Sequence, residues 1–210
     1  MADKKISQLT ELNVAASGDF LPIVDTSATC TKKIDPRNLF GVDNSSAGTY
    51  GVALGGSGNN AIGNCSFVGG GKSNKALDVC STIVGGSSNC ASGDASFIGG
   101  GQNNKACSNH SFVGGGSANC ATGTSSFVGG GNGNKACGNR STVAGGDNNC
   151  AIIAYSFVGG GNGNKACGNK SSVVGGFYNC AISNYSSIGG GYINKACGDY
   201  SSVGGGCYNC

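Results

Sequence analysis

The sequence predicts an all-β protein, a parallel β-solenoid whose short coils stack into a rod. Three observations indicate this fold. Glycine supplies 42 of the 210 residues, while there are only two Pro and no Trp. From Gly51 onward the chain follows a 15-residue repeat without insertion or deletion. Within each repeat the glycine, apolar and Asn positions recur in the same places, as expected of a chain built from stacked identical units.

Residues 1–40 lack the repeat and are expected to form a small separate module. Residues 20–25 read as a strand, 26–28 as a turn, 31–34 as a returning strand, and Asp35-Pro36 as the start of a short helix that ends near Phe40. Residues 41–50 are expected to be a polar linker. The predicted shaft spans residues 51–210, with ten full repeats and a partial eleventh.

Each repeat, numbered 1 to 15 from Gly51 in the first unit and from Ser66 in the second, reads as one coil. Position 3 is Val or Ile from Val68 onward, positions 5 and 6 are always Gly, position 9 is always Asn, and position 11 is Ala in every full unit. The Gly pair predicts a corner between two short strands, with like positions of successive coils about 4.8 Å apart. Because side chains alternate along a strand, positions 1, 3, 9 and 11 should face the interior and positions 2, 10 and 12 the outside.

The invariant Asn at position 9 is predicted to hydrogen-bond the corner backbone and to stack as an amide ladder. The alternative is that Asn occurs at position 9 simply because it favours turns. This alternative accounts less well for the type of residue at position 9 than for the invariance of that position. The ladder comprises Asn74, Asn89, Asn104, Asn119, Asn134, Asn149, Asn164, Asn179 and Asn194.

The interior of such a coil is too small to stabilise a single chain, because one Val and one Ala bury little apolar area. Further apolar side chains lie on the outward face, at position 12 and above all at position 2. We therefore expect this face to pack against other copies of the chain, most simply in a homotrimer. The position 2 residues expected at that interface are Phe67, Phe97, Phe112, Phe127 and Phe157.

A weaker period of two repeats overlies the basic one, because position 10 alternates between Lys and Cys from Lys75 to Cys210. Alternation would relieve the repulsion of lysines stacked in every coil. The alternative is a 30-residue coil, in which two repeats make one turn of a wider helix. The two readings predict rods of about 50 Å and about 25 Å respectively.

Most of the 13 cysteines fall at positions 10 and 12, where they are diagonal neighbours on one face. Free, buried thiols acting as small hydrophobes are the favoured interpretation, ahead of disulfides within or between chains, with metal binding third. The residues concerned are Cys90, Cys107, Cys120, Cys137, Cys150, Cys167, Cys180, Cys197 and Cys210.

Composition argues against several function classes. Charged residues make up 11% of the chain and the net charge is +3, which is too sparse for nucleic-acid binding. His110 is the single histidine and no acidic residue recurs beside it, so no catalytic, cofactor or metal site is expected. The N-terminus carries no secretory signal, and no segment is long and apolar enough to enter a membrane, so assembly in a cytoplasm is expected.

Two segments resemble known families. Lys5 to Leu9, Gly18 to Asp25 and Thr31 to Ile34 together resemble the N-terminal module of bacteriophage tail-fibre and tail-appendage proteins, which attaches the fibre to the virion. The repeat Ser-Phe-Val-Gly-Gly-Gly and Asn-Lys-Ala-Cys-Gly-Asn is similar to the left-handed β-roll of trimeric autotransporter adhesin heads. The first resemblance implies that residues 1–40 bind tail or baseplate proteins, with attachment through Phe20, Leu21, Ile23, Val24 and Ile34.

The function expected from these features is that of a structural component of a phage tail fibre or virion appendage, located in the virion and contributing to host adsorption. The alternative is a cellular surface adhesin or self-assembling extracellular filament. Contact with a host receptor is compatible with the aromatic residues that accumulate toward the C-terminus, although an interface role suits them equally. These residues are Phe177, Tyr178, Tyr185, Tyr192, Tyr200 and Tyr208.

Overall fold

The computed structural model describes residues 21–23, 32–34 and 44–210. Strands β1 (Leu21–Ile23) and β2 (Lys32–Ile34) pair antiparallel, with Leu21 opposite Ile34. This pairing matches the expected strand and returning strand, whereas the short helix expected after Asp35 lies outside the described residues. Among those residues there is no helix.

All remaining strands are two residues long and lie in the repeats. Those at positions 2 and 3 are β3 (Val52–Ala53), β5 (Phe67–Val68), β7 (Thr82–Ile83), β9 (Phe97–Ile98), β11 (Phe112–Val113), β13 (Phe127–Val128), β15 (Thr142–Val143), β17 (Phe157–Val158), β19 (Ser172–Val173), β21 (Ser187–Ile188) and β23 (Ser202–Val203). Those at positions 10 and 11 are β4 (Asn60–Ala61), β6 (Lys75–Ala76), β8 (Cys90–Ala91), β10 (Lys105–Ala106), β12 (Cys120–Ala121), β14 (Lys135–Ala136), β16 (Cys150–Ala151), β18 (Lys165–Ala166), β20 (Cys180–Ala181) and β22 (Lys195–Ala196).

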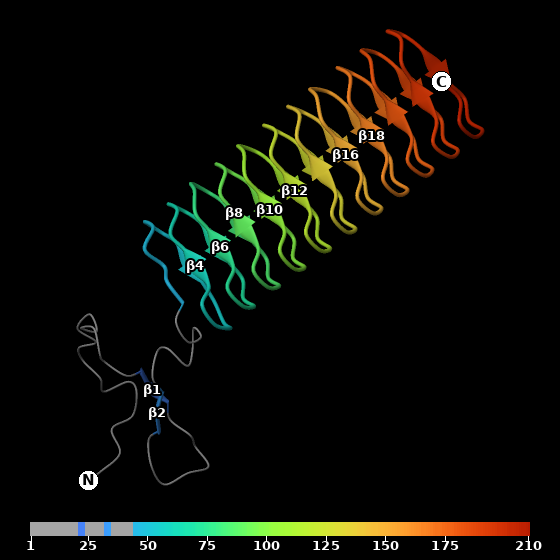
Figure 1. Ribbon diagram of the computed structural model, residues 1–210. Coiled ribbons are helices and arrows are strands. Elements are labelled where there is room, and N and C mark those ends of the chain that lie inside the picture. The colour runs from blue at the N-terminus through green and yellow to red at the C-terminus, as the bar shows by residue number, and fades with distance from the viewer. Residues whose placement is uncertain (1–20, 24–31, 35–43) are drawn as a thin grey trace, which may run out of the picture.

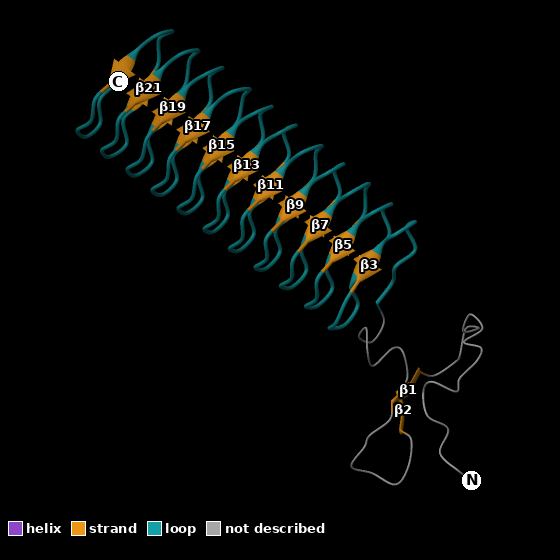
Figure 2. Cartoon of the chain, turned by 180° about the vertical axis from the view of Figure 1, so that it is seen from behind, coloured by secondary structure: helices purple, strands orange, loops and turns teal. Residues whose placement is uncertain are grey.

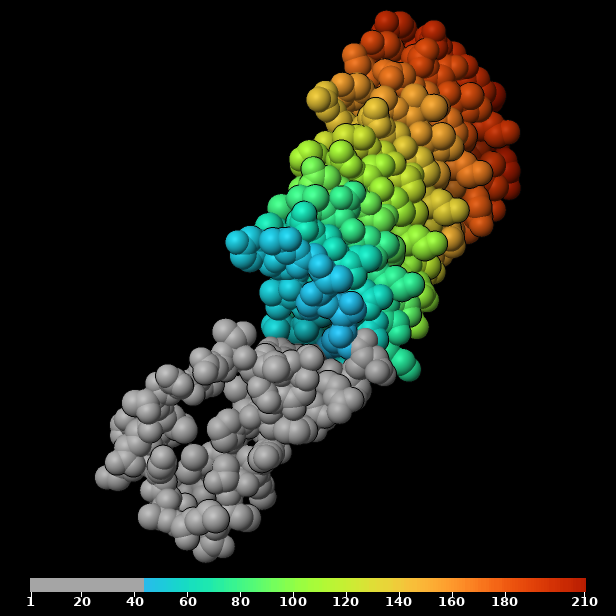
Figure 3. All heavy atoms as spheres, turned by 90° about the vertical axis from the view of Figure 1, so that its left-hand side faces the viewer, coloured from blue at the N-terminus to red at the C-terminus, as the bar shows by residue number. Residues whose placement is uncertain are grey.

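The strands form two parallel sheets on opposite sides of a rod (Figures 1 and 2). One sheet has 11 strands, from β3 to β23, and the other has 10, from β4 to β22, each in sequence order. Every strand pairs with the equivalent strand one repeat away, as where Lys105 lies opposite Cys120. One coil is therefore a single 15-residue repeat, and the 30-residue alternative is wrong. At about 4.8 Å per step, the ten steps of the 11-stranded sheet give a length of about 50 Å. Figure 3 shows the stacked coils as a rod.

A third row of backbone bridges runs along position 7, for example from Ser117 to Asn132. Each coil therefore pairs with its neighbours along three rows, whereas the sequence predicted only two, one for each short strand. The residue after each bridge, at position 8, has a positive φ, and so does the residue at position 15. This conformation reverses the N–H direction: the N–H of Ser117 donates forward to Gly131, while that of Ala118 donates back to Gln102, each over 2.9 Å.

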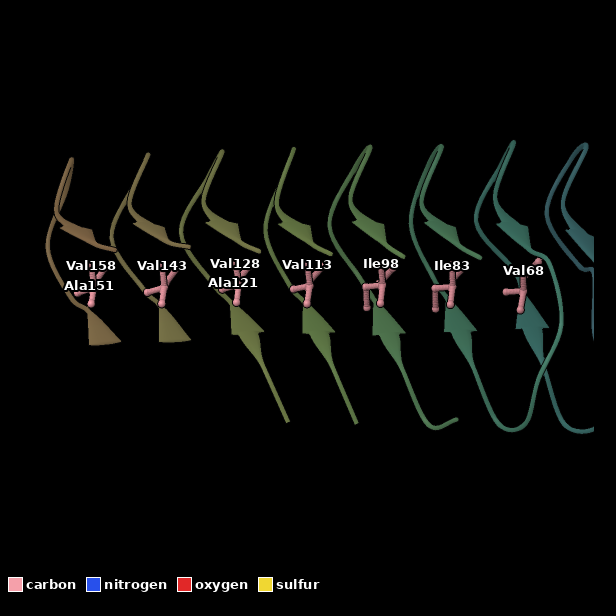
Figure 4. Packing of buried hydrophobic residues seen from close by; sticks show 14 of the residues in the cluster. Val68, Ile83, Ile98, Val113, Ala121, Val128, Val143, Ala151 and Val158 are labelled. Carbon is pink, nitrogen blue, oxygen red and sulfur yellow. The ribbon is translucent and has the colours of Figure 1, made fainter. Parts of the chain in front are cut away.

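The interior is a single file of Val or Ile from one sheet facing Ala from the other (Figure 4). The side chains at positions 3 and 11 are fully or almost fully buried in nearly every coil, as the alternation predicted. The Ser at position 1 is also buried, but its environment varies. The Ser156 hydroxyl donates to the Ile153 carbonyl over 2.6 Å, whereas that of Ser111 has no partner within the described residues.

The stack begins earlier than residue 51. Ser45 bridges to Asn60, and the side-chain oxygen of Asn44 accepts a hydrogen bond from the N–H of Asn59 over 2.9 Å. Asn44 therefore occupies the position 9 place of a preceding partial coil. Most of the segment expected to be a linker, residues 44–50, thus continues the solenoid.

Candidate functional site: the side-chain rows of the shaft

The buried Asn row joins each glycine corner to the next coil. The side-chain amide of Asn119 donates to Gly115 in its own coil over 2.9 Å and to Gly131 in the next over 2.8 Å. Its oxygen accepts from the N–H of Asn134 over 2.9 Å. The same three contacts recur along the interior rungs, where the Asn side chains are completely buried. The row thus supplies polar partners for backbone groups that the narrow coil turns inward.

The second glycine of each corner is required by geometry. Gly116, at position 6, has a φ of 86°, and a Cβ there would meet the carbonyl oxygen of Gly131 and lie 2.8 Å from the amide nitrogen of Asn119. By contrast, a Cβ on Gly115 would have no atom within 4 Å. Of the two corner glycines, it is therefore position 6 that excludes a side chain sterically, and this exclusion protects the Asn row.

The phenylalanines form an outward strip along the 11-stranded sheet. The rings of Phe97 and Phe112, and of Phe112 and Phe127, are stacked with centroids 5.0 Å apart. Phe127 and Phe157 are exposed, at 40% and 39% of their surface, while Phe67, Phe97 and Phe112 are half-buried. Stacking within one chain thus covers only part of this apolar strip.

The Lys and Cys rows lie on the outer face of the other sheet. The lysines at position 10 are exposed, and they alternate with half-buried cysteines in register. All cysteines of residues 44–210 are free thiols, and those at positions 10 and 12 are half-buried or exposed, not fully buried. The sulfur atoms of Cys167 and Cys180 lie 3.6 Å apart, and those of Cys197 and Cys210 lie 3.0 Å apart.

Two further thiol pairs occupy the same relative positions in successive coils, Cys107 with Cys120 and Cys137 with Cys150, and the two thiols of each pair interact. A hydrogen bond from the Cys150 thiol, with smaller contributions from the Thr122 hydroxyl and the charge of Lys135, lowers the pKa of Cys137 to about 6 despite its partial burial. The pKa of Cys150 is raised by the same hydrogen bond and by desolvation. One member of each such pair is therefore readily deprotonated while the other keeps its proton.

Aromatic side chains form two exposed rows over the C-terminal coils. Tyr185 and Tyr200, at position 15, stack with centroids 4.8 Å apart, and Phe177 and Tyr192, at position 7, stack at 5.6 Å. Lys170 continues the position 15 row, with its ammonium 5.0 Å from the centre of the Tyr185 ring. Tyr178 and Tyr208 pack edge-on against the position 7 row. The rows offer stacking faces and, at Lys170, a positive charge.

The residues expected to attach the chain to a virion are described only in part. Leu21, Ile23 and Ile34 belong to β1 and β2, whereas Phe20 and Val24 lie outside the described residues. His110, at position 15, belongs to no group of three or more potential metal ligands, and the described part of the chain holds no such group. None of its elements is a helix long and apolar enough to cross a membrane.

Taken together, the stacked 15-residue coils and their unbroken side-chain rows define a parallel β-solenoid. No family model matches the sequence, and no curated protein matches it.

Proposed function

We propose that the chain is a structural component of a bacteriophage tail fibre or a similar virion appendage, and that it contributes to host adsorption. The observation that carries the proposal is the uninterrupted stack of identical coils from Asn44 to the end of the chain. Such a stack is a spacer of fixed length and constant cross-section, which suits a protein whose task is to hold two attachment points apart.

Attachment to the virion is assigned to residues 1–40, through tail or baseplate proteins. The support is the resemblance of this segment to the N-terminal module of tail-fibre proteins, together with the antiparallel pairing of Leu21–Ile23 with Lys32–Ile34. The aromatic rows at positions 7 and 15 of the C-terminal coils are the surface we assign to contact with a host receptor, because exposed stacked rings suit glycan and protein binding.

The shaft is proposed to be a homotrimer of left-handed coils, as the resemblance to adhesin β-rolls implies. The support from this chain is the outward strip at position 2, where Phe127 and Phe157 remain exposed although the core behind them is only one Val and one Ala thick. Packing this strip against two further copies would cover apolar surface that a single chain leaves in water.

The oligomeric state can be measured by analytical ultracentrifugation of the full chain. We expect a particle of three 20.4 kDa chains, and a monodisperse monomer would contradict the trimer. The variant Phe127→Asp should dissociate it, because a carboxylate would be buried in an apolar interface. The control Gln102→Asp, in the exposed position 7 row, should leave the trimer intact.

The biological assignment is tested by locating the chain with a gold-labelled antibody in electron micrographs of purified particles and of host cells. Label on tail appendages supports the virion proposal. Label confined to cell surfaces, with none on particles, would instead favour the adhesin or extracellular filament.

A further inference from the structure

We propose that four cysteine pairs on the outer face of the shaft are disulfide-forming sites that join successive coils covalently once the shaft has folded. The pairs are Cys107 with Cys120, Cys137 with Cys150, Cys167 with Cys180, and Cys197 with Cys210. This inference is independent of the proposed virion role, because it concerns only the geometry of the stacked coils.

The pairing follows from register. In each pair, a cysteine at position 12 faces the cysteine at position 10 of the next coil, as the contacts of Cys167 with Cys180 and of Cys197 with Cys210 illustrate. The opposite diagonal would join position 10 of one coil to position 12 of the next, as from Cys90 to Cys107, and no hydrogen bond joins these two thiols. The stacking of the coils thus brings together one diagonal set of partners, position 12 of one coil with position 10 of the next.

The chain itself contains an unpaired control. Cys90 occupies position 10 like the second member of each pair, but position 12 of the preceding coil holds Leu77. Burial raises the pKa of the Cys90 thiol. Every cysteine at position 12, by contrast, is followed by a cysteine at position 10 of the next coil. The cysteines of position 12 therefore occur only where a partner is available.

The sulfur atoms are close enough for the bond to form with a small movement. A disulfide bond is about 2.0 Å long, so the atoms of Cys197 and Cys210, now 3.0 Å apart, need to approach by about 1 Å. Position 12 follows the two-residue strand, as Cys137 follows Lys135–Ala136. The residue therefore lacks the strand pairing to both neighbouring coils that would fix its backbone. Rotation about the side-chain bonds and a small backbone shift can supply the movement.

The chemistry requires an external oxidant, for which we specify a low-molecular-weight disulfide. The Cys137 thiolate, favoured by the hydrogen bond from Cys150 and by Lys135, attacks one sulfur of the reagent and releases the first reagent thiol. Cys150 then loses its proton to water and attacks the Cys137 sulfur, which releases the second reagent thiol. The protein loses two hydrogen atoms per bond, and the reagent is reduced to two thiols.

The test is to treat the folded full-length chain with oxidised glutathione, block the remaining thiols by alkylation, and map its tryptic peptides without reduction. Cleavage after Lys135, Arg140 and Lys165 places Cys137 and Cys150 on different peptides, so their bond appears as a linked pair. Cleavage after Lys105 and Lys135 leaves Cys107 and Cys120 on one peptide, which should be lighter by two hydrogen atoms. Cys90 should be alkylated.

Two variants sharpen the test. Cys150→Ser should expose Cys137 to alkylation and leave the other three pairs linked, whereas Cys90→Ser should change none of them. If Cys150→Ser does not fold, Cys137→Ser addresses the same pair from its exposed member. Oxidation should also raise the thermal midpoint of the wild-type chain, reversibly with reductant. Links along the other diagonal, links between chains, or four alkylated pairs after oxidation would overturn the proposal.

Discussion

The Asn row makes the most direct quantitative prediction, at the central rung Asn119. The substitution Asn119→Ala removes two amide donations, to Gly115 and Gly131, and one acceptance from the N–H of Asn134. Each hydrogen bond contributes about 1 kcal/mol net, and a buried N–H left without a partner costs about 1–3 kcal/mol more. We therefore expect the free energy of unfolding to fall by about 4–6 kcal/mol, measured by urea denaturation followed by circular dichroism.

The matched control is Asn132→Ala, because Asn132 is an exposed Asn in the neighbouring coil whose side-chain amide donates to Asp147. Its effect should stay within about 0.5 kcal/mol. A third variant, Asn119→Asp, keeps the shape but turns carboxylate oxygens toward two carbonyls. Its burial should raise the carboxyl pKa, so its penalty should grow as the pH rises through that pKa. Equal losses for Asn119→Ala and Asn132→Ala would refute the structural role of the row.

Three further outcomes follow from the same coils, each measured by urea denaturation. Gly116→Ala should destabilise the shaft by several kcal/mol, because its Cβ would meet the Gly131 carbonyl. Gly115→Ala should cost less than about 1 kcal/mol, because its Cβ would point into open space. Similar losses for the two variants would contradict this reasoning. Ile193→Gly should raise the free energy of unfolding by roughly 1 kcal/mol, because Ile193 is a β-branched residue held at a φ of 52°, which strains its backbone. A lower free energy of unfolding would show that the packing of the Ile193 side chain outweighs this strain. Ser156→Ala should lower the free energy of unfolding by about 1 kcal/mol, because the hydrogen bond to Ile153 is lost. Ser111→Ala should leave it unchanged or raise it, because the buried Ser111 hydroxyl has no partner within the described residues. A larger loss for Ser111→Ala than for Ser156→Ala would argue against these hydroxyl environments.

Much of this fold could be predicted because the repeat has no insertions. A fixed 15-residue spacing forces like positions into register, and strand alternation then assigns Val113 and Ala121 to the interior, where both are fully buried. The 30-residue alternative arose because Lys and Cys alternate on the outer face. In the structure Lys and Cys lie opposite each other in neighbouring coils, and their alternation leaves the length of one coil unchanged.

Other features were hidden by residue type. Positions 8 and 15 adopt positive φ in every coil, yet they hold residues such as Tyr178 and Arg140 that rarely favour it. The glycines at position 8, Gly58, Gly133 and Gly163, were the available signal. The early start of the stack was obscured because Ser46 stands where later units have Ala, although Asn44 and Gly48 match their positions.

The partners in the thiol pairs could not be assigned from the sequence, because that assignment depends on how the coils stack. From sequence alone, Cys107 has two diagonal neighbours, Cys90 and Cys120, and spacing along the chain does not choose between them. The stacked coils make that choice, because they bring the cysteine at position 12 toward the cysteine at position 10 of the next coil. Trimer packing of the Phe strip, attachment by residues 1–40 and host contact stay predictions, because each depends on a second molecule.

The bridges between equivalent residues of successive repeats have a consequence for how such a shaft can change its length. A deletion or duplication of one whole repeat removes or adds one layer and rejoins every hydrogen-bonded row, whereas a change that is not a whole number of repeats would shift side chains out of register. Length is therefore available only in increments of about 4.8 Å. An increment of two repeats would also keep Lys opposite Cys and each cysteine with its partner, so two layers are the smallest unit by which this rod can grow without altering its surface.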